Sequence, residues 1–288
     1  MNKLRYSEMF YSLQGEGRYV GVPSLFLRLF GCNFECRGFG QDRDRSKWLP
    51  KEQMPHNKDY PNVKAIEDLP VPHVGCDSSF SWGKKWGHLA DYDNVNTIID
   101  KINSYIPDTE PIHLVITGGE PLLKGFQPAM SDIILHRKLG LNNITFETNC
   151  TQVFKNGFDK FMHGLTAGDY TKQPVHVTWS TSPKLSISGE ERKKAIRPEV
   201  AYQYSQIPNT HLYFKFVVMD KQDLEEVDMA RKAYSDAGVE ADIYLMPLGA
   251  TAEGQAKTAK QVAELCLQYG YKFSPRLHVD LFGNKWGT

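Results

Sequence analysis

The stretch VITGGEPLL, residues 115–123, runs from β-branched residues into two glycines, a glutamate and a proline. β-Branched residues favour a strand, and paired glycines at the end of a strand let a ligand lie against bare backbone. Glu120, which follows the glycines, can accept hydrogen bonds from an ammonium group. By itself this Gly-Gly-Glu-Pro turn indicates a binding loop only weakly, so its meaning depends on the rest of the chain.

Strand-like and helical patterns alternate along the chain around this stretch. Short β-branched, leucine-rich or aromatic runs predict strands at 25–30, 113–117, 143–147, 175–180, 212–219 and 242–246. Apolar residues at helical spacing predict helices over 95–106, 221–237 and 256–269. Pro107 would end the first helix, and Asp220 and Gly238 would cap the two ends of the second. This alternation indicates βαβ units and a parallel sheet, either open or curled into a barrel.

Alternate residues in several of these strands separate an apolar face from a polar one. In strand 25–30 three leucines share one face, and Arg28 lies on the other. Strand 143–147 separates its isoleucine and phenylalanine from Glu147 in the same way. The apolar face would pack against helices and the polar face would surround a ligand. This separation predicts a partial βα barrel with a curved parallel sheet, because the interior of a closed barrel would be filled with apolar side chains.

Two cysteines, Cys32 and Cys36, follow the strand at 25–30, and 39 residues separate Cys36 from the next cysteine, Cys76. Three thiolates can hold three irons of a four-iron cluster and leave the fourth iron open to a cofactor. A zinc site with three protein ligands and ordinary buried thiols are the alternatives. The cysteines alone leave all three interpretations open.

Residues 37–75, between the second and third cysteines, hold five of the 16 prolines and many charges. Connections this long and irregular are usually functional lids or disordered segments. We therefore expect a single domain over residues 1–288, with a surface insertion at 37–75. The tryptophans Trp48, Trp82 and Trp86 are expected to serve packing rather than ligand recognition.

The charge balance limits the classes of partner. Lysine plus arginine and aspartate plus glutamate each number 34, so the net charge is zero, which disfavours a nucleic-acid binder. No apolar run reaches the ~20 residues of a membrane span, and the N-terminal residues carry no secretory signal pattern. We expect a cytoplasmic protein in which the five cysteines serve metal binding or catalysis rather than disulfides.

Taken with the upstream CxxxC after a strand, the GGEP loop resembles the radical S-adenosylmethionine superfamily. Several further stretches resemble one of its families, the 7-carboxy-7-deazaguanine synthases: residues 10–36 (FYSLQGEGRYVGVPSLFLRLFGCNFEC), GCDSSFSW at 75–82, FETN, SPK and the terminal RLHVDLFGNKWGT at 276–288. The resemblance runs from about residue 7 to the end, except for 37–75, and SLQGEG and RLHV are its specific parts. The family's third cysteine usually follows the second by two residues, so the spacing here is a departure.

This resemblance implies a lyase that converts 6-carboxy-5,6,7,8-tetrahydropterin to 7-carboxy-7-deazaguanine with release of ammonia, in a pathway of the queuosine type. It implies a [4Fe–4S] cluster on Cys32, Cys36 and Cys76, with S-adenosylmethionine chelating the open iron. It also implies Mg²⁺ at Ser78, which stands where the family has threonine. The implied partners are the pterin and a flavodoxin-like electron donor, with a homodimer as the assembly and no nucleic acid or membrane.

The resemblance also assigns binding residues, with no catalytic side chain beyond the cofactor chemistry. The residues for S-adenosylmethionine are Gly118, Gly119, Glu120, Glu147, Ser182, Pro183, Lys184, Met246, Pro247, Leu248 and Gly249. The residues for the substrate are Leu13, Gln14, Gly15, Glu16, Arg28, Thr117, His278 and Thr288. Arg28 fits the substrate carboxylate because a guanidinium fork matches a carboxylate, although strand arginines also form structural ion pairs. His278 alternates with Leu277 and Val279, so we expect it to face away from the core.

Two other functions remain compatible with these residues. One is another radical enzyme of the superfamily, such as an activating enzyme for a glycyl-radical protein, in which SLQGEG would have no role. The other is a metal-stabilised binding protein without catalysis, for which the insertion at 37–75 would be the binding element.

Overall fold

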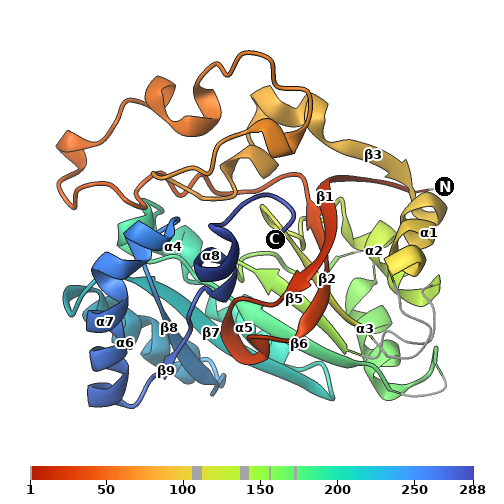
Figure 1. Cartoon of the computed structure of the whole chain (residues 1–288). Coiled ribbons are helices and arrows are strands. Elements are labelled where there is room, and N and C mark those ends of the chain that lie inside the picture. The colour runs from red at the N-terminus through yellow and green to blue at the C-terminus, as the bar shows by residue number, and fades with distance from the viewer. Residues whose placement is uncertain (1, 106–111, 137–142, 156, 172–173) are drawn as a thin grey trace.

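The computed structural model describes residues 2–105, 112–136, 143–155, 157–171 and 174–288. One nine-stranded sheet organises them, in the order β3-β1-β2-β4-β5-β6-β7-β8-β9 (Figure 1). The strands are β1 Lys3–Leu13, β2 Pro23–Leu29, β3 Asp91–Asn94, β4 His113–Gly118, β5 Asn143–Thr148, β6 His176–Thr181, β7 Thr210–Val218, β8 Asp242–Pro247 and β9 Lys272–Phe273. Strand β2 and strands β4 to β9 are parallel, and β1 and β3 are antiparallel at one edge.

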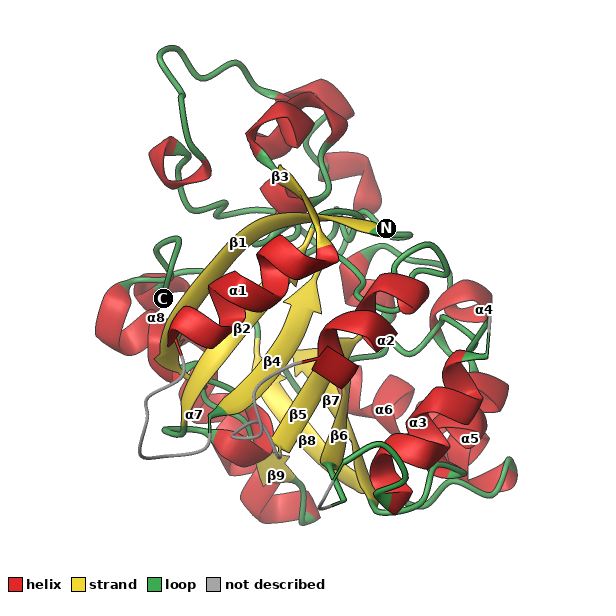
Figure 2. Cartoon of the chain, turned by 90° about the vertical axis from the view of Figure 1, so that its right-hand side faces the viewer, coloured by secondary structure: helices red, strands yellow, loops and turns green. Residues whose placement is uncertain are grey.

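The helices that cover the outer face of this curved sheet are α1 Val95–Tyr105, α2 Gln127–His136, α3 Phe158–Ala167, α5 Pro198–Ser205, α6 Gln222–Asp236 and α7 Ala252–Tyr269 (Figure 2). Two shorter helices are α4 Arg192–Ala195 and α8 Leu277–Phe282, and α8 lies in front of the sheet in Figure 1, on its other face. The edge strands β3 and β9 do not pair with each other in the described part of the chain, so the sheet stays open. This confirms the predicted partial barrel with a curved, mostly parallel sheet.

The six predicted strands and three predicted helices are present, with small differences at their ends. The N-cap of α6 is Lys221 and not Asp220, so the predicted cap was one residue off, although the carboxylate of Asp220 accepts a hydrogen bond from the backbone of Gln222 at 2.9 Å. Gly238 follows α6 with φ +84°, the left-handed conformation that ends many helices. Helix α7 starts four residues before the predicted range, and Pro107 lies outside the described residues.

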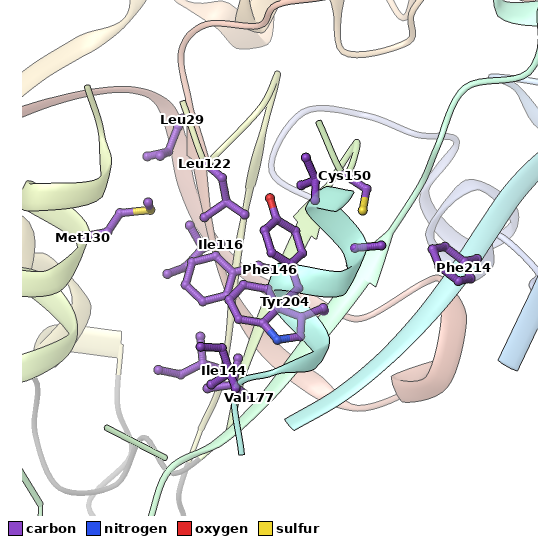
Figure 3. Close-up of a cluster of buried hydrophobic side chains, with 14 of the residues drawn as sticks. Leu29, Ile116, Leu122, Met130, Ile144, Phe146, Cys150, Val177, Tyr204 and Phe214 are labelled. Carbon is purple, nitrogen blue, oxygen red and sulfur yellow. The ribbon is translucent and has the colours of Figure 1, made fainter. Parts of the chain in front are cut away.

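The apolar strand faces form the core between sheet and helices. All three leucines of β2, at positions 25, 27 and 29, are fully buried there, with Phe146 and Trp179 from β5 and β6. Figure 3 shows how side chains from neighbouring strands and helices meet in this layer. The arrangement confirms the separation of faces and leaves the polar face free to surround a cavity.

On the polar face, His113 ties three strands together near the beginnings of the parallel strands. Its Nδ1 lies 2.9 Å from the hydroxyl of Ser24 on β2, and its Nε2 lies 2.7 Å from the hydroxyl of Thr145 on β5. The ring is 4% exposed, and burial lowers its pKa to about 4. A neutral imidazole therefore bridges two hydroxyls, one as donor and one as acceptor.

Residues 37–75 arch over one end of the sheet as the orange segment of Figure 1. Four short 3₁₀ turns interrupt them, at Arg45–Lys47, Lys51–Gln53, Pro55–Asn57 and Ile66–Asp68. Arg43 attaches the segment to the β7–α6 connection through ion pairs of 2.8 Å with Asp220 and Asp223. The segment is therefore held to the sheet at a fixed place and returns the chain to Cys76.

None of the helices within the described residues is both long enough and apolar enough to cross a membrane.

Truncating the buried leucine face is expected to weaken the fold. Leu27→Ala removes a side chain with no exposed area and should lower the free energy of unfolding by about 2–5 kcal/mol, because the cavity left behind relaxes only partly. Leu267→Ala, at a helix position that is 87% exposed, is the matched control and should change little. Urea denaturation followed by circular dichroism measures both, and equal midpoints would contradict the burial described for β2.

His113 should make stability depend on pH. Its pKa is lowered from 6.5 to about 4 in the folded protein, so between these values the unfolded chain binds a proton that the folded protein excludes. The free energy of unfolding should therefore fall as pH falls from 6.5 to 4, by roughly 3 kcal/mol at most from this group. Urea titrations at several pH values should show a shallower pH dependence for His113→Gln than for wild type. A His88→Gln control, at an exposed position, should keep the full dependence.

Candidate active site

One cavity collects residues from the carboxyl ends of the parallel strands. Strand β2 contributes Arg28, β4 contributes Thr117, β5 contributes Glu147, β7 contributes Lys215 and β8 contributes Met246. The carboxyl ends of parallel strands meet at the same edge of a sheet, which is where such folds bind ligands. The loops after these strands and the C-terminal residues complete the wall.

Cys32, Cys36 and Cys76 all line this cavity, so the distant third thiol lies beside the early pair. Burial raises the pKa of the Cys32 thiol to about 12, and it also raises the pKa of the other two. Each thiolate further disfavours ionisation of a neighbour, which a bound cation would reverse.

Within the described ranges, no three histidine, cysteine, aspartate or glutamate side chains converge as ligands of a single metal ion. A mononuclear zinc site would require such convergence on one point. A cluster is larger, because each thiolate binds its own iron. The three cavity thiols supply the thiolate donors that either an iron–sulfur cluster or a zinc ion takes.

The paired glycines bring the end of β4 against the loop that carries the first cysteine. A Cβ on Gly118, whose φ is +142°, would lie 2.4 Å from the carbonyl oxygen of Leu29. A Cβ on Gly119 would lie 2.2 Å from the carbonyl oxygen of Gly31 and 2.7 Å from the Cβ of Cys32. Any larger side chain would push the two loops apart, so these glycines set the position of the thiol as well as the cavity wall.

Glu120 and Pro183 are the two predicted residues that the structure does not bring to the cavity wall. Glu120 is fully buried, and its carboxylate accepts hydrogen bonds from the backbone of Leu122 at 3.0 Å and of Asn149 at 2.7 Å. The hydroxyl of Thr148 donates a third, at 2.8 Å. Burial raises the pKa of Glu120 to about 7. The carboxylate thus joins the turns after β4 and β5.

The remaining predicted site residues do meet around one space. They are Leu13, Gln14, Gly15, Glu16, Arg28, Cys32, Cys36, Cys76, Ser78, Thr117, Gly118, Gly119, Glu147, Ser182, Lys184, Met246, Pro247, Leu248, Gly249, His278 and Thr288. They come from both ends of the chain, from the parallel strands β2, β4, β5 and β8, and from the loop after β6, whereas β7 contributes none of them.

The SLQGEG segment supplies a buried charge network. The carboxylate of Glu16 accepts hydrogen bonds from the ammonium group of Lys215 and, at 2.9 Å, from Nε of Arg276. Burial opposes its ionisation, but these two cations outweigh burial and hold the pKa of Glu16 well below its usual range. Arg276 also donates to Asp77 at 2.6 Å. Glu16 is therefore an anion fixed from two directions.

Glu147 joins the same wall through neutral donors. It accepts hydrogen bonds from the amide of Gln14 at 3.1 Å and from the hydroxyl of Thr117 at 2.9 Å. The loop after β1 is thereby attached to the ends of β4 and β5. Two carboxylates, one held by cations and one held by neutral donors, consequently line the part of the cavity nearest SLQGEG.

Arg28 forms a structural ion pair, which was the alternative to a role in binding the substrate. Its Nε lies 2.6 Å from Oε1 of Glu8, its direct neighbour on β1. The other oxygen of Glu8 accepts a hydrogen bond from the backbone of Gly287 at 2.9 Å, which ties the C-terminal tail to the same pair. The pair occupies one nitrogen of a guanidinium that also lines the cavity.

His278 lies in helix α8, where Val279 is buried and His278 itself faces the cavity. A Cβ on Gly15 would be 1.9 Å from Nδ1 of His278, which explains why this position of SLQGEG has no side chain. Burial, helped by the charge of Arg276, lowers the pKa of His278 to about 4. A neutral imidazole therefore closes the cavity against the bare backbone of Gly15.

Several lining residues were not assigned from the sequence. They include Glu8, Phe10, Phe26, Asp77, Trp82, Asn149, Lys215 and Arg276. Lys215 could have been found from its place on the polar face of β7, and Arg276 from its place in RLHV. Trp86 is buried as expected, and Trp82 packs on the ring of His56 while it also lines the cavity.

Comparison with known proteins points to one family. No family model matches the chain. The chain is 29% identical over 285 residues to the 7-carboxy-7-deazaguanine synthase of Halobacterium salinarum, covering 98% of this chain and 91% of that protein. It is 24% identical to the protein of the same name from Pyrobaculum aerophilum, covering 99% and 97%.

A solved structure shares the fold. It is the crystal structure of QueE from Escherichia coli, with a TM-score of 0.52, 21% identity and coverage of 96% of this chain and 95% of that one. The similarity in sequence thus extends over nearly the whole chain, and the similarity in fold does so as well. The chain is a relative of the 7-carboxy-7-deazaguanine synthases.

Proposed function

We propose that the chain is a 7-carboxy-7-deazaguanine synthase, a lyase that forms 7-carboxy-7-deazaguanine from 6-carboxy-5,6,7,8-tetrahydropterin with release of ammonia. The observation that carries this proposal is the position of Cys76, which lines one cavity with Cys32 and Cys36 in spite of the 39 residues between them. The charged SLQGEG segment forms another wall of that cavity. Relatives of this name match the chain over nearly its whole length.

The three cavity thiols would hold a [4Fe–4S] cluster, and the residues at the strand ends from Gly118 to Gly249 would bind S-adenosylmethionine. When bound, these two groups supply the one-electron chemistry that starts the reaction. Ser78 and Asp77, whose side-chain oxygens are 3.2 Å apart, offer the hard oxygen ligands that Mg²⁺ prefers. Serine retains the hydroxyl of the family's threonine and loses only its methyl group.

The residues of this chain would bind and orient the pterin. The guanidinium of Arg28 keeps two terminal nitrogens for the substrate carboxylate while Glu8 holds its Nε. The fixed anion of Glu16 and the amide of Gln14 offer an acceptor and a donor to the polar edge of the ring. Phe10 and Phe26, stacked at 4.9 Å, provide an apolar wall that limits water near the substrate.

A glycyl-radical activating enzyme is a less good fit. Such an enzyme must admit a loop of a protein substrate, and the SLQGEG segment would then have no role. Here Gly15 is matched to His278, and Glu16 is held by Lys215 and Arg276. These fixed contacts of the SLQGEG segment favour a small ligand with a polar edge. The proposed setting is a cytoplasmic homodimer that receives electrons from a flavodoxin-like protein.

The function is tested by anaerobic reconstitution followed by turnover. The loaded protein should contain about four irons and four sulfides per chain, as a single cluster requires. With the carboxytetrahydropterin, S-adenosylmethionine, Mg²⁺ and a reductant, mass spectrometry should detect 7-carboxy-7-deazaguanine, and an ammonia assay should detect an equal amount of ammonia. A fully loaded protein that forms no deazaguanine would refute the proposal.

Replacing the third thiol should separate cluster binding from folding. Cys76→Ser should abolish product formation and lower iron content, because three thiolates are needed to leave one open iron. Cys266→Ser, a buried thiol on α7 outside the cavity, is the matched control and should keep both iron content and turnover. Full activity of Cys76→Ser would exclude this thiol as a ligand.

Arg28 should contribute to substrate binding through its fork geometry. Arg28→Lys keeps the charge beside Glu8 but loses the paired donors, so KM for the pterin should rise about 10- to 100-fold, as for the loss of ~1.5–3 kcal/mol from a charged hydrogen bond. Steady-state kinetics measure this. Arg197→Lys, an exposed position paired with Glu199, should leave KM unchanged. An unchanged KM in Arg28→Lys would leave only the structural ion pair as the role of Arg28.

A further inference from the structure

One cavity thiol has a contact that the other two lack. The indole Nε1–H of Trp82 donates to Sγ of Cys76, at a distance of 3.5 Å. Cys32 accepts only a backbone hydrogen bond, from Phe34 at 3.4 Å. Of the three thiols, Cys76 alone accepts a side-chain hydrogen bond from the described residues. The donor lines the cavity itself, so it lies on the ligand side of the thiol.

The position of this indole depends on residues 37–75, the insertion. The ring of His56 packs on the ring of Trp82, with centroids 4.5 Å apart and planes at 53°. His56 is only 4% exposed, and its backbone carbonyl accepts a hydrogen bond from the indole of Trp86 at 2.9 Å. A Cβ on Gly83 would come within 3.2 Å of the Cβ of His56, so the two segments pack closely.

A small apolar cluster stabilises this contact from behind. Ile66 and Leu69 of the insertion are buried with Phe80 and Trp86, which flank Trp82 in sequence. Phe80 and Trp86 also contact each other edge to face, at 5.7 Å between ring centroids. The insertion and the segment 79–86 therefore form one packed unit, in which the rotamer of Trp82 is set by both.

Hydrogen bonds to cysteine sulfur are one of the factors that set the reduction potential of an iron–sulfur cluster. An N–H aimed at a thiolate stabilises negative charge on the sulfur, and the reduced cluster carries one more negative charge than the oxidised one. The donor thus favours reduction. Its loss should make the cluster harder to reduce.

We infer that the insertion 37–75 tunes the reduction potential of the cluster, with His56 as a positioning residue that holds the indole N–H of Trp82 on Cys76. This inference rests on the proposed function, because it needs a cluster on the three cavity thiols. It assigns the insertion a role inside the enzyme rather than a partner outside it. The insertion residues that line the cavity themselves, Phe39, Val71, Pro72 and Gly75, are different from the residue that contacts Trp82, His56.

The test is a redox titration of the reconstituted full-length protein, without substrate or S-adenosylmethionine, followed by electron paramagnetic resonance. Trp82→Phe keeps an aromatic ring and removes the N–H, so its midpoint potential should become more negative than that of wild type. His56→Ala keeps the indole and removes its support, so its midpoint should shift in the same direction by a smaller amount. Iron and sulfide are counted first, so that only fully loaded samples are compared.

Trp48→Phe is the matched control. This tryptophan lies in the same insertion, but its indole donates to the backbone carbonyl of Asp42 at 2.6 Å and does not touch a cavity thiol. Its midpoint potential should equal that of wild type. A shift of the same size in Trp48→Phe would show a general effect of loosening the insertion and would overturn the inference.

The remaining outcomes separate this inference from the proposed function. A loaded Trp82→Phe with the wild-type midpoint overturns the inference while the enzyme stays a synthase. If Trp82→Phe does not load, His56→Ala decides, and an unchanged midpoint there overturns the role of the insertion. A wild-type protein that holds no reducible cluster after reconstitution overturns the proposed function, and the inference falls with it.

Discussion

The carboxylate of Glu16 is the point at which distant parts of the chain meet. It pairs with Lys215 from β7 and with Arg276 before α8, and Arg276 continues to Asp77 beside the third cysteine. Glu16, Lys215 and Arg276 are largely withdrawn from water, whereas Asp77 is partly exposed, and a buried ion that loses its partner costs about 3–5 kcal/mol. The loop after β1, the sheet, the end of the insertion and the C-terminal segment must therefore assemble together.

This constraint also explains how an open sheet can enclose a ligand. The sheet ends at β9 without returning to β3 in the described chain, so backbone pairing does not close the cavity. Side chains and short loops close it instead. The ring of His278 packs against the backbone of Gly15, and the carboxylate of Glu8 accepts hydrogen bonds from Arg28 and from the backbone of Gly287. Residues from both termini form this closure. Side chains from the two ends of the chain thus close the open side of the partial barrel without an additional strand.

The insertion illustrates how a long loop can serve a nearby centre. Its ion pairs to Asp220 and Asp223 and its apolar contacts with Phe80 and Trp86 fix both of its ends to the body of the protein. A long connection costs little additional closure entropy once its ends are held, because that cost grows only with the logarithm of length. Cys76 can therefore sit beside Cys32 and Cys36 as though it followed them closely in sequence.

The sequence by itself determined the strands, the separation of their two faces and most of the cavity residues, because these depend on local periodicity and on motifs that lie at strand ends. Leu27 and Arg28 are opposite in character and adjacent in sequence, so their faces follow from alternation alone. Tertiary structure decided what periodicity does not encode: that Glu120 is buried among the turns, that Glu8 meets Arg28, and that His56 supports Trp82. Such pairs are brought together only by strand register and packing, which join residues that no local pattern relates.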